Sequence, residues 1–450
     1  MRSIEKTENP MGTRPVFPLL ISMSLPPMVS MLIQSMYNVV DSIYLARFSQ
    51  DALTAVSLAY PLQNLVLAAA VGFGIGINAC ISRSLGEKNQ KEIISAASHG
   101  VVLTALHSLF FVLAGLFLSG PFIRMFTDSE SVAEMGITYS RIVICLSFAS
   151  LFHILIEKIF QAAGSMVVPM LLQAAGALIN IILDPIFIFG YLGFPAMGVA
   201  GAAIATIAGQ MAACSLAVLM FIKKDIGVRV ELRGFRFRKS MVLRLYSVGA
   251  PAAAMTALPS VMVGLLNGIL AGLSQTSVAV LGIYIKLQSF VYMPANGVVQ
   301  GLRPIVGYCY GAGVPDRIHK CVRAALLVIG GIMAAGTVLF LGIPGIIMSM
   351  FQAEGEMMSM GVTALRILSL GFVVSTVSLV ISGTFEGLGN GMASLVINLI
   401  RQFLITPPLA AILSVSMGIN GVWAAFPAAE MLAAVVSVIL FRKNKATRRL

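Results

Sequence analysis

Long uninterrupted apolar segments run through almost all of this 450-residue chain. Residues 101–120 and 202–222, for example, contain no Asp, Glu, Lys or Arg. A helix of about 20 apolar residues is long enough to cross the hydrocarbon core of a bilayer. Hydrophobic residues make up 58% of the chain and charged residues only 11%, against about 25% charged residues in a typical soluble domain. The sequence therefore excludes a water-soluble globular protein and predicts an all-α integral membrane protein.

Short polar stretches separate the apolar segments, and the pattern predicts twelve transmembrane helices. Several of these segments are longer than a straight span requires, which indicates tilted or kinked helices, or ends that extend into water. We expect the twelve helices at residues 15–46, 53–82, 93–120, 134–158, 167–190, 197–222, 245–271, 278–302, 319–346, 358–384, 392–414 and 418–441.

The basic residues predict the orientation of these helices. With both termini in the cytoplasm, two of the 30 Lys and Arg residues fall in outer loops and four within spans, which leaves 24 on the cytoplasmic side. An excess of Lys and Arg in cytoplasmic loops is the usual topology signal. We expect a multi-pass protein of the plasma membrane with cytoplasmic termini. The basic residues of the cytoplasmic loops account for the net charge of +12, which therefore gives no reason to expect nucleic-acid binding.

An internal repeat relates the two halves of the chain. A shift of 225 residues aligns Pro26 with Pro251, and a five-residue deletion later aligns Met197 with Met417. The same shift also aligns Gly72 with Gly297, Gly76 with Gly301, and Phe160 with Phe385. An even number of spans separates equivalent points, so both halves have the same orientation. We predict an N-terminal six-helix lobe at 1–222, a cytoplasmic linker at 223–244, and a C-terminal six-helix lobe at 245–450, related by a parallel pseudo-two-fold axis.

Two parallel six-helix repeats favour a transporter with a central cavity that works by alternating access. The sequence contains no GxxxxGK[ST] motif of an ATP-binding loop, so an ion gradient is the simplest energy source. It also lacks HExxH and GxSxG, and we expect no enzymatic activity. The five cysteines and four histidines show no metal-ligand spacing, so we expect no cofactor.

Several motifs, taken together, resemble the multidrug and toxic compound extrusion (MATE) family over essentially the whole chain. The first helix carries SLPPMVSMLIQSMYNVVDSIYLARF (24–48), and the fifth carries INIILDPIFIFG (179–190). Further similar segments are SRSLGEKNQKE (82–92), FQAAGS (160–165), MGVAGAAIATIAGQ (197–210) and GYCYGAGVPDRI (307–318). The intramembrane Asp of the first helix and the Asn-x-x-x-Asp-Pro of the fifth resemble the DinF-like and MepA-like bacterial branch.

The resemblance implies a secondary active multidrug efflux antiporter that exports organic cations in exchange for H⁺ or Na⁺. Its partners would be small cationic or amphipathic molecules and the lipid bilayer, and we expect a monomer. A lipid-linked oligosaccharide flippase of the same wider superfamily is the alternative. Such a flippase should carry several positive side chains for a diphosphate. A non-transporting receptor or scaffold is a further alternative, but it has no use for a complete parallel repeat.

Asp41 is an acidic residue within the first predicted span. An ionised carboxylate costs about 2.5–3.5 kcal/mol at the centre of a membrane helix, so such residues usually face a cavity or the bundle interior. Tyr37 and Asn38 lie one turn earlier on the same face and can hydrogen-bond the carboxyl group. Asp41 is therefore either an ion-coupling carboxylate or a polar clamp between helices, and the family resemblance favours ion coupling.

Asp184 is a second intramembrane acid, and Asn180 lies one turn before it on the same face. Pro185 follows and frees a backbone carbonyl. Carboxylate, amide and carbonyl oxygens suit Na⁺, so Asp41, Asn180 and Asp184 would be its ligands if coupling uses Na⁺. The same group can hold a proton, because two neighbouring carboxylates cannot both ionise at low cost. By resemblance, Thr206 contributes a hydroxyl near this site, although it could instead bond to its own helix backbone.

Other residues are expected in the substrate cavity or at hinges. The cavity candidates are Gln34, Tyr37, Asn38, Gln63, Met255, Gln288 and Glu430. Pro26, Pro27 and Pro185 are the hinge candidates, because proline interrupts the hydrogen bonding of a helix. Glu430 could form a buried pair with Arg401 of the eleventh helix. The seventh and tenth predicted helices lack intramembrane acids, and Asp41 and Asp184 have no acidic counterpart in the second half. The ion-coupling site is therefore expected in the N-terminal lobe.

Overall fold

The computed structural model describes residues 9–444, and these residues are almost entirely helical. Within this range, eleven helices are long and apolar enough to cross a membrane. The pair α5 (Glu130–Cys145) and α6 (Phe148–Ala162), bent by 44°, supplies a twelfth span where one continuous helix over 134–158 is expected. The predicted all-α membrane architecture is confirmed. Residues 1–8 and 445–450, expected in the cytoplasm, lie outside the described residues.

The helices pack into two units. The N-unit comprises Val29–Ala253, and the C-unit comprises the described residues up to Met28 and from Ala254 onwards. The N-unit contains α3 (Gln50–Gly86), α4 (Gln90–Arg124), α5, α6, α7 (Val167–Phe189), η1 (Tyr191–Gly193) and α8 (Gly198–Lys223). The expected division into lobes 1–222 and 245–450 stays a prediction about the repeat along the chain.

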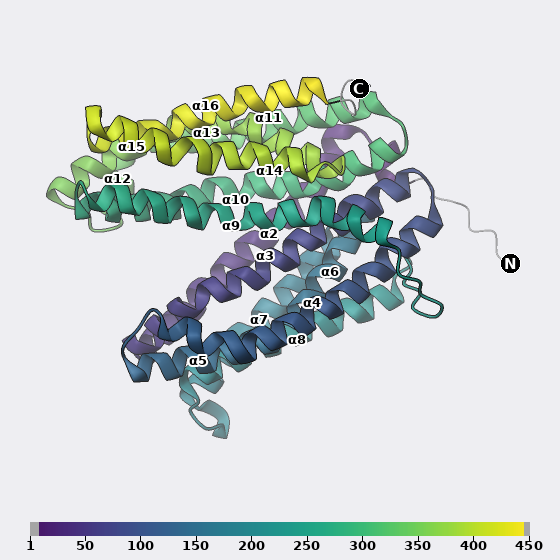
Figure 1. Ribbon diagram of the computed structural model, residues 1–450, viewed down its shortest axis with the longest axis horizontal. Helices are drawn as coiled ribbons and strands as arrows, with labels where there is room; N and C mark the ends of the chain where they lie inside the picture. Colours follow the sequence, from purple (N-terminus) through teal and green to yellow (C-terminus); the bar gives the residue numbers. More distant parts are fainter. Residues whose placement is uncertain (1–8, 445–450) are drawn as a thin grey trace. The chain divides into compact units, whose positions relative to one another are not determined.

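The C-unit contains α1 (Pro10–Thr13), α10 (Gln275–Gly311), α11 (Pro315–Gly342), α12 (Pro344–Ser349), α13 (Gly355–Gly387), α14 (Gly391–Leu399), the π-helical η2 (Ile400–Ile405), α15 (Thr406–Met417) and α16 (Ile419–Lys443). Two helices, α2 (Val16–Phe48) and α9 (Lys239–Ala271), each begin in one unit and continue into the other. Within the C-unit, α13 runs alongside both α10 and α16, and within the N-unit α7 runs alongside α8 (Figure 1).

Glycines explain why the first halves of α2 and α9 pack as they do. A Cβ on Gly76 of α3 would lie 2.2 Å from the carbonyl oxygen of Leu245 in α9. A Cβ on Gly301 of α10 would lie 2.8 Å from the carbonyl oxygen of Met23 in α2. Only glycine permits such approaches, because any side chain would overlap the facing backbone. Gly76 and Gly301 are repeat equivalents. In each repeat this glycine lets the first half of the other repeat's first helix pack closely.

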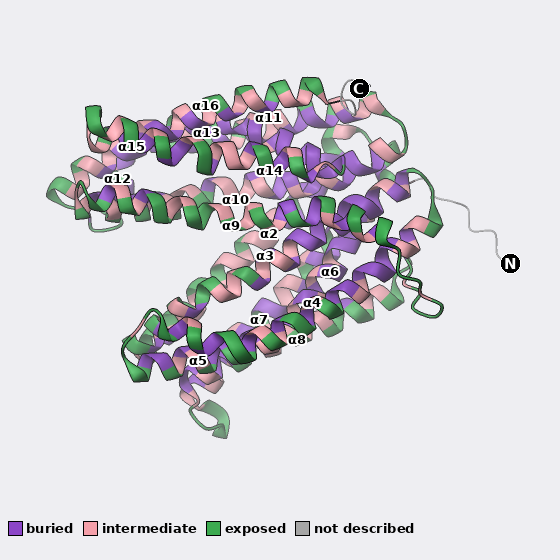
Figure 2. Cartoon of the chain, viewed as in Figure 1, coloured by how far each residue is buried: buried purple, intermediate pink, exposed green. Residues whose placement is uncertain are grey.

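Polar caps begin several of the helices. Ser49 accepts a hydrogen bond from the N–H of Ala52 at the start of α3, and Asn89 accepts one from Glu92 at the start of α4. Such caps satisfy backbone donors that have no partner within the helix. Between their ends the helices carry exposed faces beside buried ones (Figure 2), and many of the exposed side chains are large and apolar. Phe117 is 70% exposed and Leu327 is 72% exposed, as expected of side chains that contact lipid.

Candidate functional site

Helices α7 and α8 cross closely because glycine faces backbone at the crossing. A Cβ on Gly209 of α8 would lie 2.6 Å from the carbonyl oxygen of Gly176 and 3.2 Å from Cβ of Asn180. Neither distance leaves room for a larger residue without movement of α7. The crossing therefore brings the polar residues of the two helices together.

Asn180, Asp184 and Thr206 form a cluster at this crossing. Nδ2 of Asn180 donates a hydrogen bond to Oδ1 of Asp184 at 3.1 Å and approaches Oγ1 of Thr206 at 3.5 Å. Asn180 is 3% exposed and Asp184 is fully buried. The one-turn spacing within α7 puts both side chains on one face. The structure thus brings together three of the four predicted ion-coupling residues, and their role in coupling stays a prediction.

Asp41 of α2 lies in the same unit and is half-buried. It is close enough to Asp184 for the two charges to interact. Among the described residues, no hydrogen bond joins Asp41 to Tyr37 or Asn38, and Oδ1 of Asp41 is buried without a partner. The expected hydrogen bonds are therefore absent, although Tyr37 lies within electrostatic range of both acids.

Unsatisfied acceptors are concentrated around this cluster. Oδ1 of Asp41, Oδ1 of Asn180 and Oδ2 of Asp184 are buried and accept no hydrogen bond from any described residue. Oε1 of Gln210, one turn after Thr206 on α8, is in the same situation. A buried acceptor without a donor is costly. A small cation can satisfy several oxygens at once, so this oxygen set has the chemistry of a cation site.

Gln63 is linked to the cluster by Tyr139, a residue that the sequence motifs did not single out. Its Nε2 donates to the hydroxyl oxygen of Tyr139 at 3.1 Å. Tyr139 is 2% exposed and interacts electrostatically with Asp41 and Asp184. Gln34 is half-buried on α2, whereas Asn38 is exposed there. Gln210 was also missed, although the 220-residue offset that follows the repeat deletion aligns it with Glu430.

The remaining cavity candidates lie in the C-unit. Sδ of Met255 accepts contacts from Oγ of Ser394 at 3.4 Å and Nδ2 of Asn398 at 3.1 Å. Gln288 lies close to the hydroxyl group of Tyr292. The pair considered from the sequence, Arg401 with Glu430, is present in this unit.

The hinge candidates lie inside continuous helices. Pro26 and Pro27 are within α2, and Pro185 is within α7. The part of α2 that belongs to the C-unit ends at Met28, directly after the two prolines. Their role as hinges stays a prediction.

Two further polar clusters, one in each unit, occupy equivalent positions of the repeat. Their residues are not among the site candidates taken from the sequence. In the N-unit, Nδ2 of Asn78 donates to the carbonyl of Lys158, whose Nζ donates to Gln161 at 3.0 Å. In the C-unit, Arg303 forms an ion pair with Glu386. The 225-residue shift relates Asn78 to Arg303 and Gln161 to Glu386. The repeat alignment thus contained the signal for both clusters.

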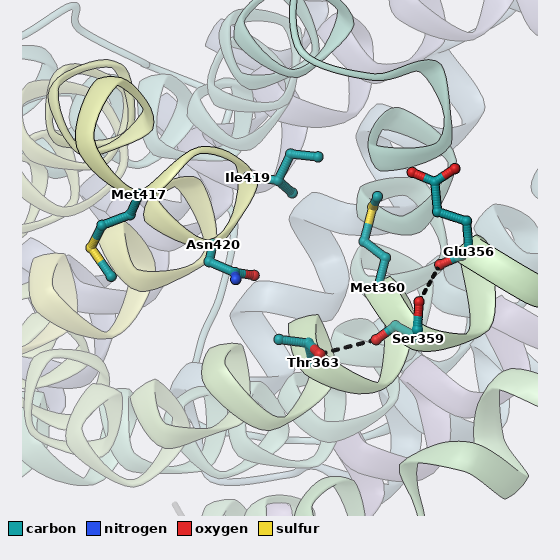
Figure 3. Close-up of a pocket in the computed structure, with 7 residues that line it drawn as sticks. All are labelled: Glu356, Ser359, Met360, Thr363, Met417, Ile419 and Asn420. Atoms are coloured by element: carbon teal, nitrogen blue, oxygen red, sulfur yellow. Dashed lines mark hydrogen bonds between the residues drawn. The ribbon is translucent and has the colours of Figure 1, made fainter.

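A shallow pocket of about 290 Å³ opens in the C-unit where the start of α13 meets the junction of α15 and α16 (Figure 3). Its lining residues are Glu356, Ser359, Met360, Thr363, Met417, Ile419 and Asn420. Ser359 and Thr363 donate to backbone carbonyls of their own helix (Figure 3). None of the predicted site residues lines this pocket.

Among residues 9–444, no three His, Cys, Asp or Glu side chains are grouped as a metal site. The N-unit cluster offers two carboxylates with an amide and a hydroxyl instead. Such a mixed oxygen set suits a hard monovalent cation or a proton rather than a tightly held transition metal.

A repeated bundle of apolar helices, with two buried aspartates outside any ion pair of the described residues, is the architecture of a multi-pass membrane transporter. The MatE family model matches residues 26–186 and 251–412, two segments that begin at the aligned prolines. The chain belongs to the MatE family.

Known proteins are similar over nearly the full length. The multidrug export protein MepA of Staphylococcus aureus is 25% identical over 429 residues, which cover 95% of this chain and 93% of MepA. An FAD transporter of Shewanella oneidensis is 24% identical and covers 95% of each chain. The structure titled as the outward-facing conformation of a multidrug resistance MATE family transporter matches with a TM-score of 0.91 at 22% identity, and covers 99% of both chains. This structural likeness shows a shared fold.

Proposed function

We propose that this protein is a secondary active antiporter that exports organic cations in exchange for H⁺ or Na⁺. The supporting observation is a set of buried oxygens that accept no hydrogen bond from residues 9–444, at Asp41, Asn180, Asp184 and Gln210. Repulsion between two carboxylates is strong where water is excluded. Uptake of one cation relieves both the repulsion and the missing hydrogen bonds.

Charge at the site supports a cationic coupling ion. Among the described residues, no Lys, Arg or His forms an ion pair with Asp41 or Asp184. The names of the similar proteins include multidrug export and FAD transport, so family membership by itself leaves the substrate class open. The acidic cluster of the N-unit favours cations over anions there.

Antiport requires that the ion and the substrate favour opposite states of the protein, and the coupling cannot exceed their differential affinities. Neutralisation of Asp41 removes the cost of an ionised carboxylate within a span. We infer that α2 then bends at Pro26-Pro27, where proline has already removed helical hydrogen bonds. The bend changes the surroundings of the N-unit site and releases the substrate outward.

The decisive experiment is ethidium movement in proteoliposomes that contain the full chain, driven separately by a proton gradient and by a sodium gradient. Asp41→Asn should insert and fold normally but lose transport, because it cannot exchange a cation. Asp128→Asn, which makes the same change at an exposed position, should transport like wild type. Normal transport by Asp41→Asn at equal protein content would refute the mechanism.

A lipid-linked oligosaccharide flippase is the alternative function. It needs several positive side chains together for a diphosphate, whereas Arg303 and Arg401 of the C-unit each lie beside a glutamate that offsets the charge. This pairing favours the antiporter. If folded wild-type protein moves no ethidium under either gradient, a lipid-linked substrate becomes the next one to test.

A further inference from the structure

The span that contains α14, η2 and α15 changes to a π-helix at Ile400–Ile405. Pro407 and Pro408 follow and lack the N–H groups that would bond to residues 403 and 404 in a regular α-helix. Single π turns within helices occur frequently at functional sites. Irregular backbone at membrane depth is stable only where protein buries it or where it lines a water-filled cavity. The segment around Arg401 is therefore a candidate binding region.

Arg401 forms a buried but incomplete ion pair. Its Nη1 lies 3.5 Å from Oε1 of Glu430 on α16, and the two side chains are 12% and 14% exposed. Nη1 of Arg401 and Oε2 of Glu430 are buried and make no hydrogen bond with any described residue. A buried pair repays the cost of its desolvation only with good geometry and full hydrogen bonding. This pair has neither, so its donor and acceptor capacity is available to a ligand.

Polar groups from two other helices lie around the pair. Tyr284 and Tyr292 of α10 interact electrostatically with both charges, and the hydroxyl of Tyr292 donates to Ser375 of α13 at 2.9 Å. Oε1 of Gln402, next to Arg401, is also buried and accepts no hydrogen bond from the part of the chain that the structure describes. Four elements of one unit thus contribute to a polar site that is not satisfied internally.

Gly371 of α13 makes room for the glutamate. A Cβ there would lie 3.4 Å from Cγ of Glu430 and 3.3 Å from Cα of Pro427. A larger residue at position 371 would therefore press on α16 at the point where it carries the acid.

The fold itself does not require charges at this position. The repeat offsets relate Arg401 to Gly176 and Glu430 to Gln210. In the N-unit the equivalent helices meet through the close Gly176–Gly209 crossing, where the described residues form no ion pair. Since the same helix packing is achieved there with neutral residues, the charged pair of the C-unit calls for a separate explanation.

We propose that Arg401 is the oxyanion-binding residue of a substrate subsite in the C-unit, and that Glu430 holds Arg401 while the subsite is empty. The proposal rests on the transport function above and deepens it, because it adds substrates that carry a carboxylate or phosphate group beside a positive charge. The acid group replaces Glu430 and accepts two parallel N–H···O hydrogen bonds from the guanidinium.

Two dyes that differ only at one acid group test this subsite. Rhodamine 110 has a free carboxylate, and rhodamine 123 is its methyl ester. Binding to the purified full chain in a neutral detergent is measured by fluorescence anisotropy. Arg401→Met should weaken rhodamine 110 binding about tenfold, the equivalent of one charge-assisted hydrogen bond. Binding of rhodamine 123 should change less than about twofold, since the ester offers no charge to the guanidinium.

Glu430→Gln gives the opposite expectation, because it removes the group that competes for Arg401. Rhodamine 110 should bind several-fold more tightly to this variant, with rhodamine 123 little changed. An ion pair with a purely structural role predicts that both dyes lose affinity together in both variants, and that result would overturn the proposal.

Removal of one charge can prevent folding by leaving its partner buried alone. The double variant Arg401→Met/Glu430→Met avoids this, and its affinity for rhodamine 110 relative to rhodamine 123 should fall below that of the wild type. Arg366→Met, at an exposed arginine of α13, removes one positive charge as Arg401→Met does and should keep the wild-type ratio of the two affinities. An unchanged ratio of the two affinities in the double variant would contradict the subsite.

Two further arms separate the remaining explanations. Added anionic phospholipid should not displace rhodamine 110 from wild-type protein, and displacement would overturn the assignment to a transported solute. Rhodamine 123 transport by the same proteins in proteoliposomes tests the proposed function independently. If the wild-type protein does not transport rhodamine 123 but Arg401→Met still weakens rhodamine 110 binding selectively, the result counts against the antiporter. If the wild-type protein transports rhodamine 123 but Arg401→Met changes both dye affinities equally, the result counts against the subsite.

Discussion

Asp184 is fully buried, and within residues 9–444 only one of its carboxylate oxygens accepts a hydrogen bond, from Asn180. The one-turn spacing of Asn180 and Asp184 was readable from the sequence because helical geometry fixes which residues share a face. The lack of a partner for Asp41 was not readable. Spacing places Tyr37 and Asn38 near it, but the packing of neighbouring helices decides where each side chain turns.

A bound cation should stabilise the protein through the Asp184 cluster. A ligand that binds only the folded state adds about 2.7 kcal/mol to the free energy of unfolding at a hundredfold excess over Kd. We expect the coupling cation to raise the Tm of wild type and to leave that of Asp184→Asn unchanged. Thermal unfolding is followed with Na⁺ titrated against choline at fixed pH, and then with pH varied in the absence of Na⁺.

Asp128→Asn is the matched control for this measurement, because Asp128 is exposed in the loop before α5. It should respond to the cation as wild type does. Equal stabilisation of Asp184→Asn and wild type would show that the cation binds elsewhere.

The α7–α8 crossing sets the position of Asn180 at the scale of whole elements. Gly209→Ala would place a Cβ 2.6 Å from the carbonyl oxygen of Gly176 and 3.2 Å from Cβ of Asn180. Overpacking of this kind costs about 1–3 kcal/mol. We expect a lower Tm together with a smaller cation-induced rise in Tm, because Asn180 must move.

Gly331→Ala of α11 is the control for the glycine substitution, because a Cβ there meets nothing within 4 Å. Replacing glycine by alanine within a helix stabilises it by about 0.5–1 kcal/mol where space allows. If the two alanine variants have the same stability, the crossing is not as tight as the distances indicate.

Helix breaks illustrate a limit of the sequence at this scale. Pro407-Pro408 signals a disturbance in the eleventh span, yet the π-helical register of Ile400–Ile405 depends on how Arg401 and its neighbours pack. The bend between α5 and α6 carries no proline at its break. Neither feature follows from local propensity, because both are settled by contacts with other helices.

Topology is a property of the whole molecule, and the positive-inside rule predicts it from loop composition. In a variant that lacks the five native cysteines, Asp128→Cys should react with a membrane-impermeant maleimide on intact cells. Arg233→Cys, in the predicted linker, should react only after permeabilisation. The reverse pattern would overturn the predicted orientation.

The sequence by itself determined that this is a helical membrane protein built from a duplicated unit, because the length of apolar runs and the 225-residue repeat depend on the chain alone. It also located Asp41, Asn180 and Asp184, since acids within apolar spans are conspicuous. The tertiary structure decided that the first halves of α2 and α9 each pack with the opposite repeat, and that Arg401 meets Glu430. These features arise from contacts between residues far apart in the chain, and no local pattern encodes which backbone faces each glycine or which charge faces each arginine.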